Sequence, residues 1–546
     1  MSVMRLSDRV RRELTYLSYP SREWTLPHYR NGARVLDVLI VGAGQAGLAV
    51  AFGLKLERIS NIRIVDRNRR GQEGPWRRFA RMRELRTAKD VTGMDLGIPN
   101  LTPRAWYEAK FGRKAWERIQ KISPRVWQDY LDWYREVLEL PVENDTEVIS
   151  IGPADNLLVA ELRRQGEVER VLARKVVLAT GLDGSGGWRV HPLVADLPPQ
   201  RYAHASDALD FGRCAGKRVA VLGAGASAFD NAAAALEAGA ASVDLYLRRA
   251  EIPRVNPLFW TNFAAMLGHF AELTDVERWR LMRHILEELP IPPPQDSFWR
   301  CRRFKNFRWH SNCVWRSVRT DDDTALVETN AGTFACDFII FATGVEINLL
   351  ARSELAPIVQ QIALWRDRFT PPAGEESDLL AGYPYLGTAF EFMEREPGAA
   401  PYLRRLHNFT FGATLSLGIT GAAITGLKYG VPRLVNGLVR DLFREDAARY
   451  YQELLAYDVA ELETLERPFA WIDRLSAEAI SMHTLLDELD QAGLGKVLRR
   501  RPGPRQPDEE RRTARGKPNR PPQKSLPSPG RSRSKGTRKR SRRLAN

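Results

Sequence analysis

The sequence has few cysteines, no cysteine pair of the C-x-x-C type and no signal for secretion. Its four cysteines, Cys214, Cys301, Cys313 and Cys336, are scattered along 546 residues. This spacing counts against a dithiol redox centre and against a zinc site, and we predict no bound metal. Residues 1–17 contain four Arg, one Asp and one Glu and lack the apolar segment of a signal peptide. Together with the scarcity of cysteine, this predicts a cytoplasmic protein.

Net charge is absent from most of the chain and concentrated at its end. The formal net charge is +15, and residues 499–546 alone hold 18 Lys or Arg against 3 Asp or Glu. The first 498 residues are therefore neutral overall. The end is also rich in Pro, Ser and Gly, a composition that cannot bury a core, so we expect a disordered basic tail over 499–546. Such a tail could contact nucleic acid or acidic membranes, or be incidental to the folded body.

Two glycine-rich turns, each after an apolar strand and before a helix, are the most informative motifs. The first, Gly42-Ala43-Gly44-Gln45-Ala46-Gly47, follows Val38-Leu39-Ile40-Val41, and the second, Gly223-Ala224-Gly225-Ala226-Ser227-Ala228, follows Val219-Ala220-Val221-Leu222. A strand that runs into G-x-G-x-x-G and a helix presents backbone N–H groups and a helix dipole to a pyrophosphate. Asp37 and the first turn also make the apolar stretch 35–54 a strand-turn-helix unit rather than a membrane span.

The strands that follow the two turns end in opposite charges. Asp66 ends the first unit, after Ile62–Val65, whereas Arg248 and Arg249 end the second, after Val243–Leu247. A carboxylate accepts hydrogen bonds from both ribose hydroxyls and repels a 2′-phosphate, while guanidinium groups bind one. We therefore predict FAD at Gly42, Gly44, Gly47 and Asp66, and NADPH at Gly223, Gly225, Ser227, Arg248 and Arg249. Two such dinucleotides are typical of a flavoprotein that NADPH reduces.

Two other buried strands end in the letters A-T-G, over 175–181 and 337–344. Small residues there let the backbone pass close to a cofactor, which adds Thr180, Gly181, Thr343 and Gly344 to the predicted cofactor-binding residues. The segment 417–423 has the pattern of a helix N-terminus suited to the electron-rich edge of a reduced flavin, which adds Gly418 and Thr420. The alternative for this segment is an ordinary capped helix.

These motifs predict an α/β fold with two Rossmann-like domains, the NADPH domain inserted in the FAD domain, and helical additions. The predicted parts are a lead-in at 1–34, the FAD domain at 35–199 and 346–450, the NADPH domain at 200–345, helices at 451–498 and the tail at 499–546. Ser123 and Pro124 predict the start of a helix whose aromatic stripe packs on the body.

The predicted NADPH domain contains an insert, 252–319, that is dense in Trp, Phe, His and Pro. Six of its residues are candidates to line a substrate pocket or to form the core of a helical lid: Asn256, Trp260, Phe263, Trp299, Phe304 and Trp309.

With these motifs the chain resembles the class B flavoprotein monooxygenases, which include flavin-containing monooxygenases, Baeyer–Villiger monooxygenases and lysine or ornithine N-hydroxylases. The resemblance covers about residues 35–450 and rests on both turns, both A-T-G strands, Asp66 followed by Gly74-Pro75-Trp76, and His204 ahead of the second turn. It implies that Trp76 lies near the flavin. It also implies that NADPH reduces the flavin, that O2 adds at C4a, and that the hydroperoxide transfers oxygen to a nitrogen, sulfur or ketone of a small molecule.

Two departures from the family pattern bear on the catalytic residues. The F-x-G half of the family's F-x-G-x-x-x-H motif is missing before His204, and Ala88 stands where an asparagine is usual. By the resemblance, His204 orients NADP(H) or closes the domain hinge. Lys89 is a candidate to donate to the peroxide in place of the asparagine, or else is a surface lysine in a loop.

Two other functions stay open at this point. The chain could be an NADPH-dependent reductase that passes electrons to a quinone or a protein, or a nucleic-acid-binding protein that uses its basic tail. The sequence indicates neither a particular substrate nor an oligomeric state.

Overall fold

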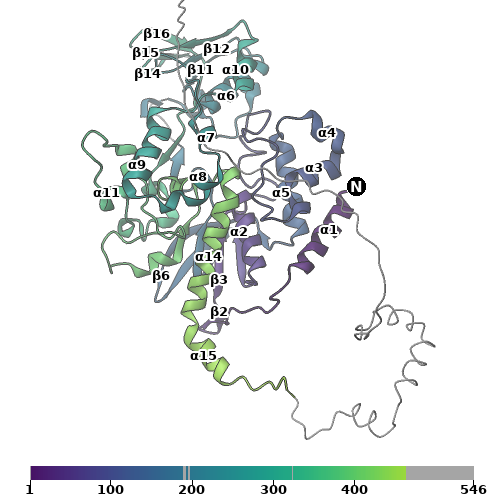
Figure 1. The fold of residues 1–546 in the computed structure, drawn as a ribbon. Coiled ribbons are helices and arrows are strands. Elements are labelled where there is room, and N and C mark those ends of the chain that lie inside the picture. Colours follow the sequence, from purple (N-terminus) through teal and green to yellow (C-terminus); the bar gives the residue numbers. More distant parts are fainter. Residues whose placement is uncertain (1, 189–191, 195–196, 322–323, 463–546) are drawn as a thin grey trace, which may run out of the picture. The chain divides into compact units, whose positions relative to one another are not determined.

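The computed structural model describes residues 2–188, 192–194, 197–321 and 324–462 (Figure 1). The described residues up to Ala456 form one compact unit, and the chain from Tyr457 onward is separate from it, with only residues 457–462 described. The predicted helices beyond 462 and the predicted tail at 499–546 lie outside the described residues. No helix in the described part is long and apolar enough to cross a membrane.

A seven-stranded sheet forms the first Rossmann-like domain. Its strand order is β5 (Val142–Glu143), β4 (Ile62–Val65), β3 (Leu36–Val41), β8 (Glu167–Leu178), β7 (Leu157–Arg164) and β6 (Thr146–Ala154), and β19 (Leu406–Asn408) also pairs with β8. Strands β5, β4, β3, β8 and β19 are parallel, and β6, β7 and β8 form an antiparallel meander. The residues of β3 from Asp37 to Val41 are buried, as a central parallel strand requires.

Helix α2 (Gln45–Leu56) packs on this sheet. It begins at the first glycine turn and packs beside α14 (Leu427–Glu445), and Figure 1 shows the two side by side. Gly53 of α2 leaves room for Val435 of α14, because a Cβ at Gly53 would lie 2.9 Å from the valine methyl.

Three further helices pack together beside the sheet, namely α1 (Val3–Tyr16), α3 (Pro103–Phe111) and α5 (Pro124–Val137), and α4 (Arg113–Arg118) adjoins α3. The Ser123 hydroxyl accepts the Val126 N–H, which confirms the predicted cap of α5. The aromatic stripe of α5 is core, since Trp127, Tyr130 and Tyr134 are each at most 1% exposed.

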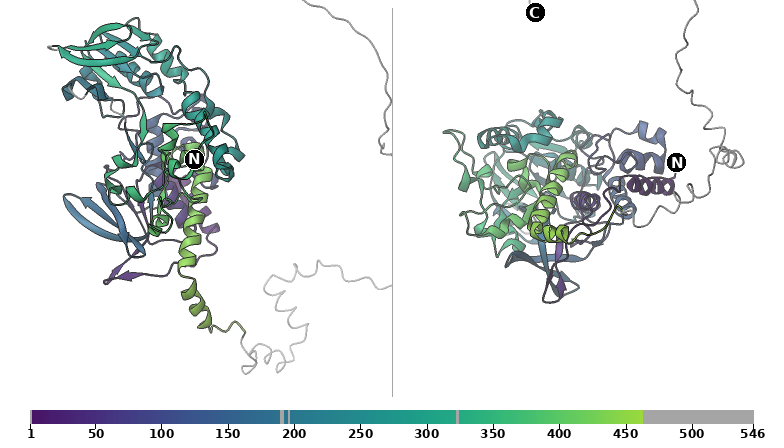
Figure 2. Two further views of the ribbon diagram at one scale, coloured as in Figure 1. Left: turned by 90° about the vertical axis from the view of Figure 1, so that its left-hand side faces the viewer. Right: turned by 60° about the horizontal axis from the view of Figure 1, so that its bottom comes forward.

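The second Rossmann-like domain contains a five-stranded, all-parallel sheet. Its order is β10 (Tyr202–His204), β17 (Phe338–Phe341), β11 (Arg218–Leu222), β12 (Ser242–Tyr246) and β13 (Phe307–His310). Helix α6 (Ala226–Glu237) connects β11 to β12, and α10 (Gln295–Arg302) packs on α6. An antiparallel sheet of β14 (Trp315–Asp321), β15 (Thr324–Thr329) and β16 (Gly332–Cys336), teal in Figure 2, packs on the other face of the five strands.

The chain enters and leaves this second domain through two paired strands. β9 (Gly186–Trp188) and β18 (Val345–Ile347) are antiparallel neighbours, and β19 then returns to the first sheet. The predicted α/β class with two Rossmann-like domains, one inserted in the other, is confirmed. Short helices of the return segment are α11 (Trp365–Arg368), α12 (Asp378–Ala381) and α13 (Thr414–Leu417), and α15 (Ala447–Leu455) follows α14.

The aromatic-rich insert forms helices and also supplies strands to the second domain. It contains α7 (Pro257–Trp260), α8 (Ala264–His269), α9 (Asp275–Arg283) and α10, but it also supplies β13, the edge strand of the second sheet, and the beginning of β14. The side chains of Trp260 and Trp299 are 64% and 58% exposed. Phe304, in contrast, packs against the core of the second domain.

Candidate functional site

The first glycine turn is packed closely on one side and open on the other. Gly42 has φ +103°, and a Cβ there would lie 2.6 Å from the carbonyl oxygen of Ala179, in the first A-T-G strand. A Cβ at Gly47 would lie 1.8 Å from the Gly42 carbonyl oxygen, whereas a Cβ at Gly44 would meet no atom within 4 Å. The turn therefore needs glycine at 42 and 47 for packing, and it leaves open space beside Gly44 at the start of α2.

Asp66 lies at the end of β4, next to this turn, and is only 7% exposed. The Gly42 N–H donates to the Val65 carbonyl oxygen at 2.8 Å, which joins the turn to β4. One carboxylate oxygen of Asp66 accepts the Ala43 N–H at 2.9 Å, and the other accepts the backbone and side-chain N–H groups of Asn68. The carboxylate is thus held in one orientation before any ligand binds.

A cavity of about 560 Å³ runs past this turn. The predicted residues that line it are Gly42, Gly44, Asp66, Trp76, Thr180 and Gly181. The hydroxyl of Thr180 has no hydrogen-bond partner among the described residues, although it is buried. Trp76 lies against Trp127, whose indole N–H donates to the Gln45 side chain at the start of α2. The structure therefore brings this set of residues together, with Gly47 packed behind it.

One end of the cavity contains residues that sequence reasoning missed. These are Arg78, Phe79, Trp188, Ser206, Asp207 and Ala208. The rings of Phe79 and Trp188 lie 5.5 Å apart, edge to face. The guanidinium of Arg78 forms no hydrogen bond or ion pair with any described residue; the Phe79 ring lies 5.9 Å from it. The sequence signals near this wall are the Gly74-Pro75-Trp76 motif and His204.

His204 lies beside this end of the cavity but does not line it. It ends β10, is 5% exposed, and its ring lies 5.5 Å from that of Trp188. Its Nδ1 accepts the Ser206 backbone N–H at 3.1 Å and contacts the Ser206 hydroxyl at 2.7 Å, which leaves the ring proton on Nε2. Nε2 is buried without a partner in the described part of the chain. Burial lowers the pKa of His204, so the ring is neutral at physiological pH.

Lys89 lies elsewhere. Its ammonium group donates to the carbonyl oxygens of Trp116 and Ile119, at 2.9 and 2.7 Å, and lies 5.2 Å from the Trp116 ring centre. These contacts attach its loop to α4, and Lys89 does not line the cavity.

The segment 417–423 is not a helix N-terminus. Gly418, with φ +76°, ends α13, a 3₁₀ turn follows at Ile424–Gly426, and α14 begins at Leu427. The Thr420 hydroxyl donates to the Leu417 carbonyl oxygen at 3.1 Å, so both predicted residues serve the local turn. Ala422 lines the cavity, and its carbonyl oxygen accepts the Gln45 side chain. The run of small residues conceals this boundary in the sequence.

The second glycine turn repeats the geometry of the first. Gly223 has φ +135°, a Cβ there would lie 2.4 Å from the Ala342 carbonyl oxygen, and its N–H donates to the Tyr246 carbonyl oxygen at 3.0 Å. Gly225, like Gly44, has open space around its missing Cβ. Ser227 is exposed in the first turn of α6. Thr343 and Gly344 come after Ala342, which follows β17 and packs against this turn.

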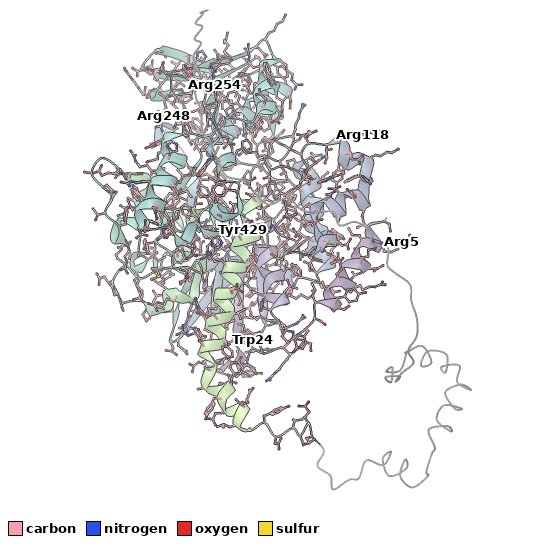
Figure 3. The ribbon with its side chains drawn as sticks, in the orientation of Figure 1. Arg5, Trp24, Arg118, Arg248, Arg254 and Tyr429 are labelled. Carbon is pink, nitrogen blue, oxygen red and sulfur yellow. The ribbon has the colours of Figure 1, made fainter. Side chains whose placement is uncertain are left out.

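Arg248 and Arg249 follow β12. Arg248 is exposed on the second domain, at the top of Figure 3, and Arg249 is half-buried. Neither guanidinium has a hydrogen-bond or ion-pair partner among the described residues. Burial, with the neighbouring charge of Arg248, lowers the pKa of Arg249. None of the six aromatic and polar insert residues named above lines the cavity.

Both turns fit the predicted nucleotides. The open faces at Gly44 and Gly225 admit a pyrophosphate close to the backbone, where a larger residue would fill the space. The fixed carboxylate of Asp66 suits ribose hydroxyls, and the free guanidinium groups at 248 and 249 suit a 2′-phosphate.

Comparison with known proteins agrees with this geometry. Residues 39–266 match the family model described as pyridine nucleotide-disulphide oxidoreductase. The chain is 40% identical over 462 residues to an FAD-dependent urate hydroxylase of Xanthomonas campestris, covering 84% of this chain and 97% of that protein. It is 32% identical over 151 residues to an uncharacterized oxidoreductase of Geobacillus kaustophilus, covering 27% of this chain and 36% of that protein.

Solved structures share the fold at low sequence identity. The reduced form of ornithine hydroxylase from Pseudomonas aeruginosa superposes with a TM-score of 0.58 at 15% identity, over 75% of this chain and 100% of that one. L-Lysine 6-monooxygenase from Pseudomonas syringae gives a TM-score of 0.58 at 17% identity, over 74% and 99% of the two chains. The chain belongs to the family of the FAD-dependent urate hydroxylase.

Proposed function

We propose that this FAD- and NADPH-dependent monooxygenase hydroxylates urate or a closely related planar, anionic heterocycle. The observation that carries the proposal is the 40% identity to a urate hydroxylase, which extends along 97% of that protein. The coarser reaction, oxygenation of a small molecule with O2, follows from the family.

The residues at the end of the cavity that the sequence did not predict favour a substrate that is anionic and flat. Urate carries a negative charge at neutral pH and has two aromatic-like faces. Arg78 offers a guanidinium without a competing carboxylate partner, and Phe79 and Trp188 offer ring surfaces beside it. A guanidinium donates two parallel hydrogen bonds to planar anions, and aromatic rings pack well on planar rings. We therefore assign the substrate to this end.

The other residues hold the cofactors. Gly42, Gly44 and Gly47 form the pyrophosphate cradle of FAD, Asp66 accepts the ribose hydroxyls, and Thr180 and Trp76 line the path toward the flavin ring. The second turn and Arg248 hold NADPH. Bound FAD supplies the oxygen-activating chemistry and NADPH supplies the two electrons. In the net reaction one atom of O2 enters urate, the other leaves in water, and NADPH becomes NADP⁺.

His204 has a positioning role in this proposal. A neutral imidazole with its proton on Nε2 is a hydrogen-bond donor, and this one has no protein partner in the described part of the chain. It can therefore donate to NADP(H) where the second domain meets the cavity. Because the ring is neutral and its Nδ1 is already bonded, we do not assign it the role of a general base.

The test is oxygen incorporation from labelled O2. The FAD-loaded protein is mixed with NADPH and urate, and urate loss, NADPH oxidation and labelled product are measured together. We expect NADPH oxidation that urate accelerates, with one labelled oxygen per urate consumed. Ornithine and lysine serve as control substrates. NADPH oxidation that urate does not change, with all reducing equivalents recovered as hydrogen peroxide or in an added quinone, would instead indicate a reductase.

A further inference from the structure

The segment 78–86 connects the cavity to the second nucleotide domain. At its start, Arg78 and Phe79 line the cavity next to Trp76. Three more arginines follow, at 81, 83 and 86. Each of these three contacts the part of the chain that forms the second domain, so we call residues 78–86 the arginine segment.

Arg81 contacts the chain where it enters the second domain. Its Nη2 donates to the carbonyl oxygens of Asp207 and Leu209, at 3.1 and 3.4 Å, and its guanidinium lies 5.2 Å from the Phe211 ring centre. Its Nη1 donates back to the Arg78 carbonyl oxygen at 2.9 Å. Asp207 itself lines the cavity. Arg81 therefore holds the arginine segment against the cavity wall that the second domain provides.

Arg83 and Arg86 reach two carboxylates on α6. Arg83 pairs with Glu237 at 2.6 Å, and Arg86 pairs with Asp230 at 3.4 Å. Arg300, on α10, completes the network. It pairs with Glu237 at 2.9 Å and with Asp230 at 3.7 Å, and it donates to the Arg81 carbonyl oxygen at 3.0 Å.

Asp230 is the central acceptor of this network. Its side chain is 3% exposed, and it also accepts the Ser297 hydroxyl. Asp230 lies on α6 one turn after Ser227, so the same helix carries the proposed NADPH cradle at its start and the contact to the arginine segment one turn later. A carboxylate this buried is compensated by its charged partners, Arg86 and Arg300, together with the Ser297 hydroxyl.

We propose that Asp230 is a positioning residue for hydride transfer from NADPH to FAD. Through Arg86 and Arg300 it fixes α6, and with it the NADPH cradle at the start of that helix, relative to the arginine segment, which begins at the end of the cavity that we assign to the substrate. In the step it positions, NADPH loses a hydride and becomes NADP⁺, while FAD takes up that hydride and a proton. This inference rests on the proposed function, because it requires that both nucleotides bind where we place them.

The test is Asp230→Asn, which keeps the size of the side chain and removes its charge. Under anaerobic conditions, rapid mixing with NADPH separates the limiting rate constant of flavin reduction from the Kd of NADPH. We expect the rate constant to fall by about tenfold to hundredfold, since displacement of a reacting group by an ångström has effects of this size. The Kd of NADPH and the FAD content should stay within about twofold of wild type, because neither cradle is touched.

A second measurement does not depend on turnover. Hydrogen exchange of the apoprotein should show faster exchange over 78–86 and 207–211 in the variant, because the contacts from α6 and α10 no longer hold the segment. The matched control is Arg218→Gln, which breaks the Arg218–Asp337 ion pair of 2.6 Å within the second domain and leaves the arginine segment untouched. Arg218→Gln should change neither the rate constant of flavin reduction nor the hydrogen exchange over 78–86 and 207–211.

The outcomes separate the two proposals. If wild-type protein is not reduced by NADPH at all, the proposed function fails. If wild type is reduced and Asp230→Asn is reduced at the same rate, the positioning role is wrong while the proposed function stands; a raised Kd with an unchanged rate constant has the same meaning. Should Asp230→Asn not fold, Arg86→Gln, whose side chain is 47% exposed, removes one of the same contacts and must give a slower reduction with unchanged FAD content.

Discussion

The carboxylate of Asp66 accepts the backbone N–H of Ala43 at 2.9 Å, so the residue that we assign to the ribose of FAD also fixes the turn that we assign to its pyrophosphate. Strand end and glycine turn are two parts of one preformed site. The side chain at position 66 therefore has two roles, since it binds the ribose and accepts the backbone N–H of Ala43.

Asp66→Ala should lose FAD and also lower the stability of the apoprotein. The variant removes the ribose acceptor and leaves the Ala43 N–H without its partner, which costs about 1–3 kcal/mol when such a group is buried. Flavin absorbance of the purified protein and urea unfolding of the apoprotein measure the two effects. Asp66→Asn, which retains one acceptor oxygen, should be closer to wild type in stability. A yellow Asp66→Ala protein with full FAD content would refute our placement of the cofactor.

Gly44 and Gly47 should respond differently to a side chain, although they belong to one motif. A Cβ at Gly44 enters open space, so Gly44→Val should fold normally and purify without colour, because its side chain fills the pyrophosphate position. A Cβ at Gly47 would lie 1.8 Å from the Gly42 carbonyl oxygen, so Gly47→Ala should unfold at lower urea concentration even without FAD. Equal stability of the Gly44→Val and Gly47→Ala apoproteins would contradict the assignment of Gly44 to cofactor binding and of Gly47 to packing of the turn.

The features that the sequence predicts well are those that local chemistry determines. Each glycine turn needs a positive φ at its first glycine, which glycine alone adopts freely, and each sits between a buried strand and a helix. The charge at the end of the following strand is likewise a local feature. The Ser123 cap and the aromatic face of α5 also follow from short-range rules.

The features that the sequence misses depend on long-range contacts. Arg78 and Trp188 are more than a hundred residues apart, and only the folded chain places both on one wall of the cavity. Lys89 bonds to carbonyl groups 27 and 30 residues away, which no spacing rule predicts. The sequence pattern at 417–423 does not distinguish the end of one helix from the start of the next, because small residues are compatible with either.

His407 should make the folded protein sensitive to acid. Its ring is fully buried, Nδ1 contacts the Ala389 carbonyl oxygen at 2.8 Å, and burial lowers its pKa to about 4. The unfolded value is about 6.5, so between these values the unfolded chain binds a proton that the folded one does not, and stability falls as pH falls, by up to about 3 kcal/mol. In His407→Gln this loss should be absent when urea unfolding is compared at pH 7 and pH 4. If the free energy of unfolding changed equally with pH in both proteins, His407 would not be the source of the acid sensitivity.

The two guanidinium groups after β12 should set the preference for NADPH over NADH. Arg248 and Arg249 have no partners in the described part of the chain, and a 2′-phosphate would pair with them. Replacement of both by Ala should raise the KM for NADPH by about tenfold or more and leave the KM for NADH nearly unchanged, as expected for loss of a charged hydrogen-bonded contact. Steady-state oxidation of the two nucleotides measures this. An unchanged preference would assign the 2′-phosphate to another residue.

Arg78 should determine the affinity for an anionic substrate without affecting either nucleotide. Arg78→Gln keeps a polar side chain of similar reach, but it cannot pair with the negative charge of urate, and Arg78→Lys keeps the charge without the planar pair of donors. We expect kcat/KM for urate to fall by about tenfold to hundredfold in the glutamine variant and by less in the lysine variant. The loss should lie mainly in KM, because Arg78 binds the anion both before and during oxygen transfer. FAD content and the rate of flavin reduction by NADPH serve as internal controls and should match wild type. Loss of FAD in Arg78→Gln would instead indicate that Arg78 contacts the cofactor. An unchanged KM for urate would show that Arg78 does not bind the substrate.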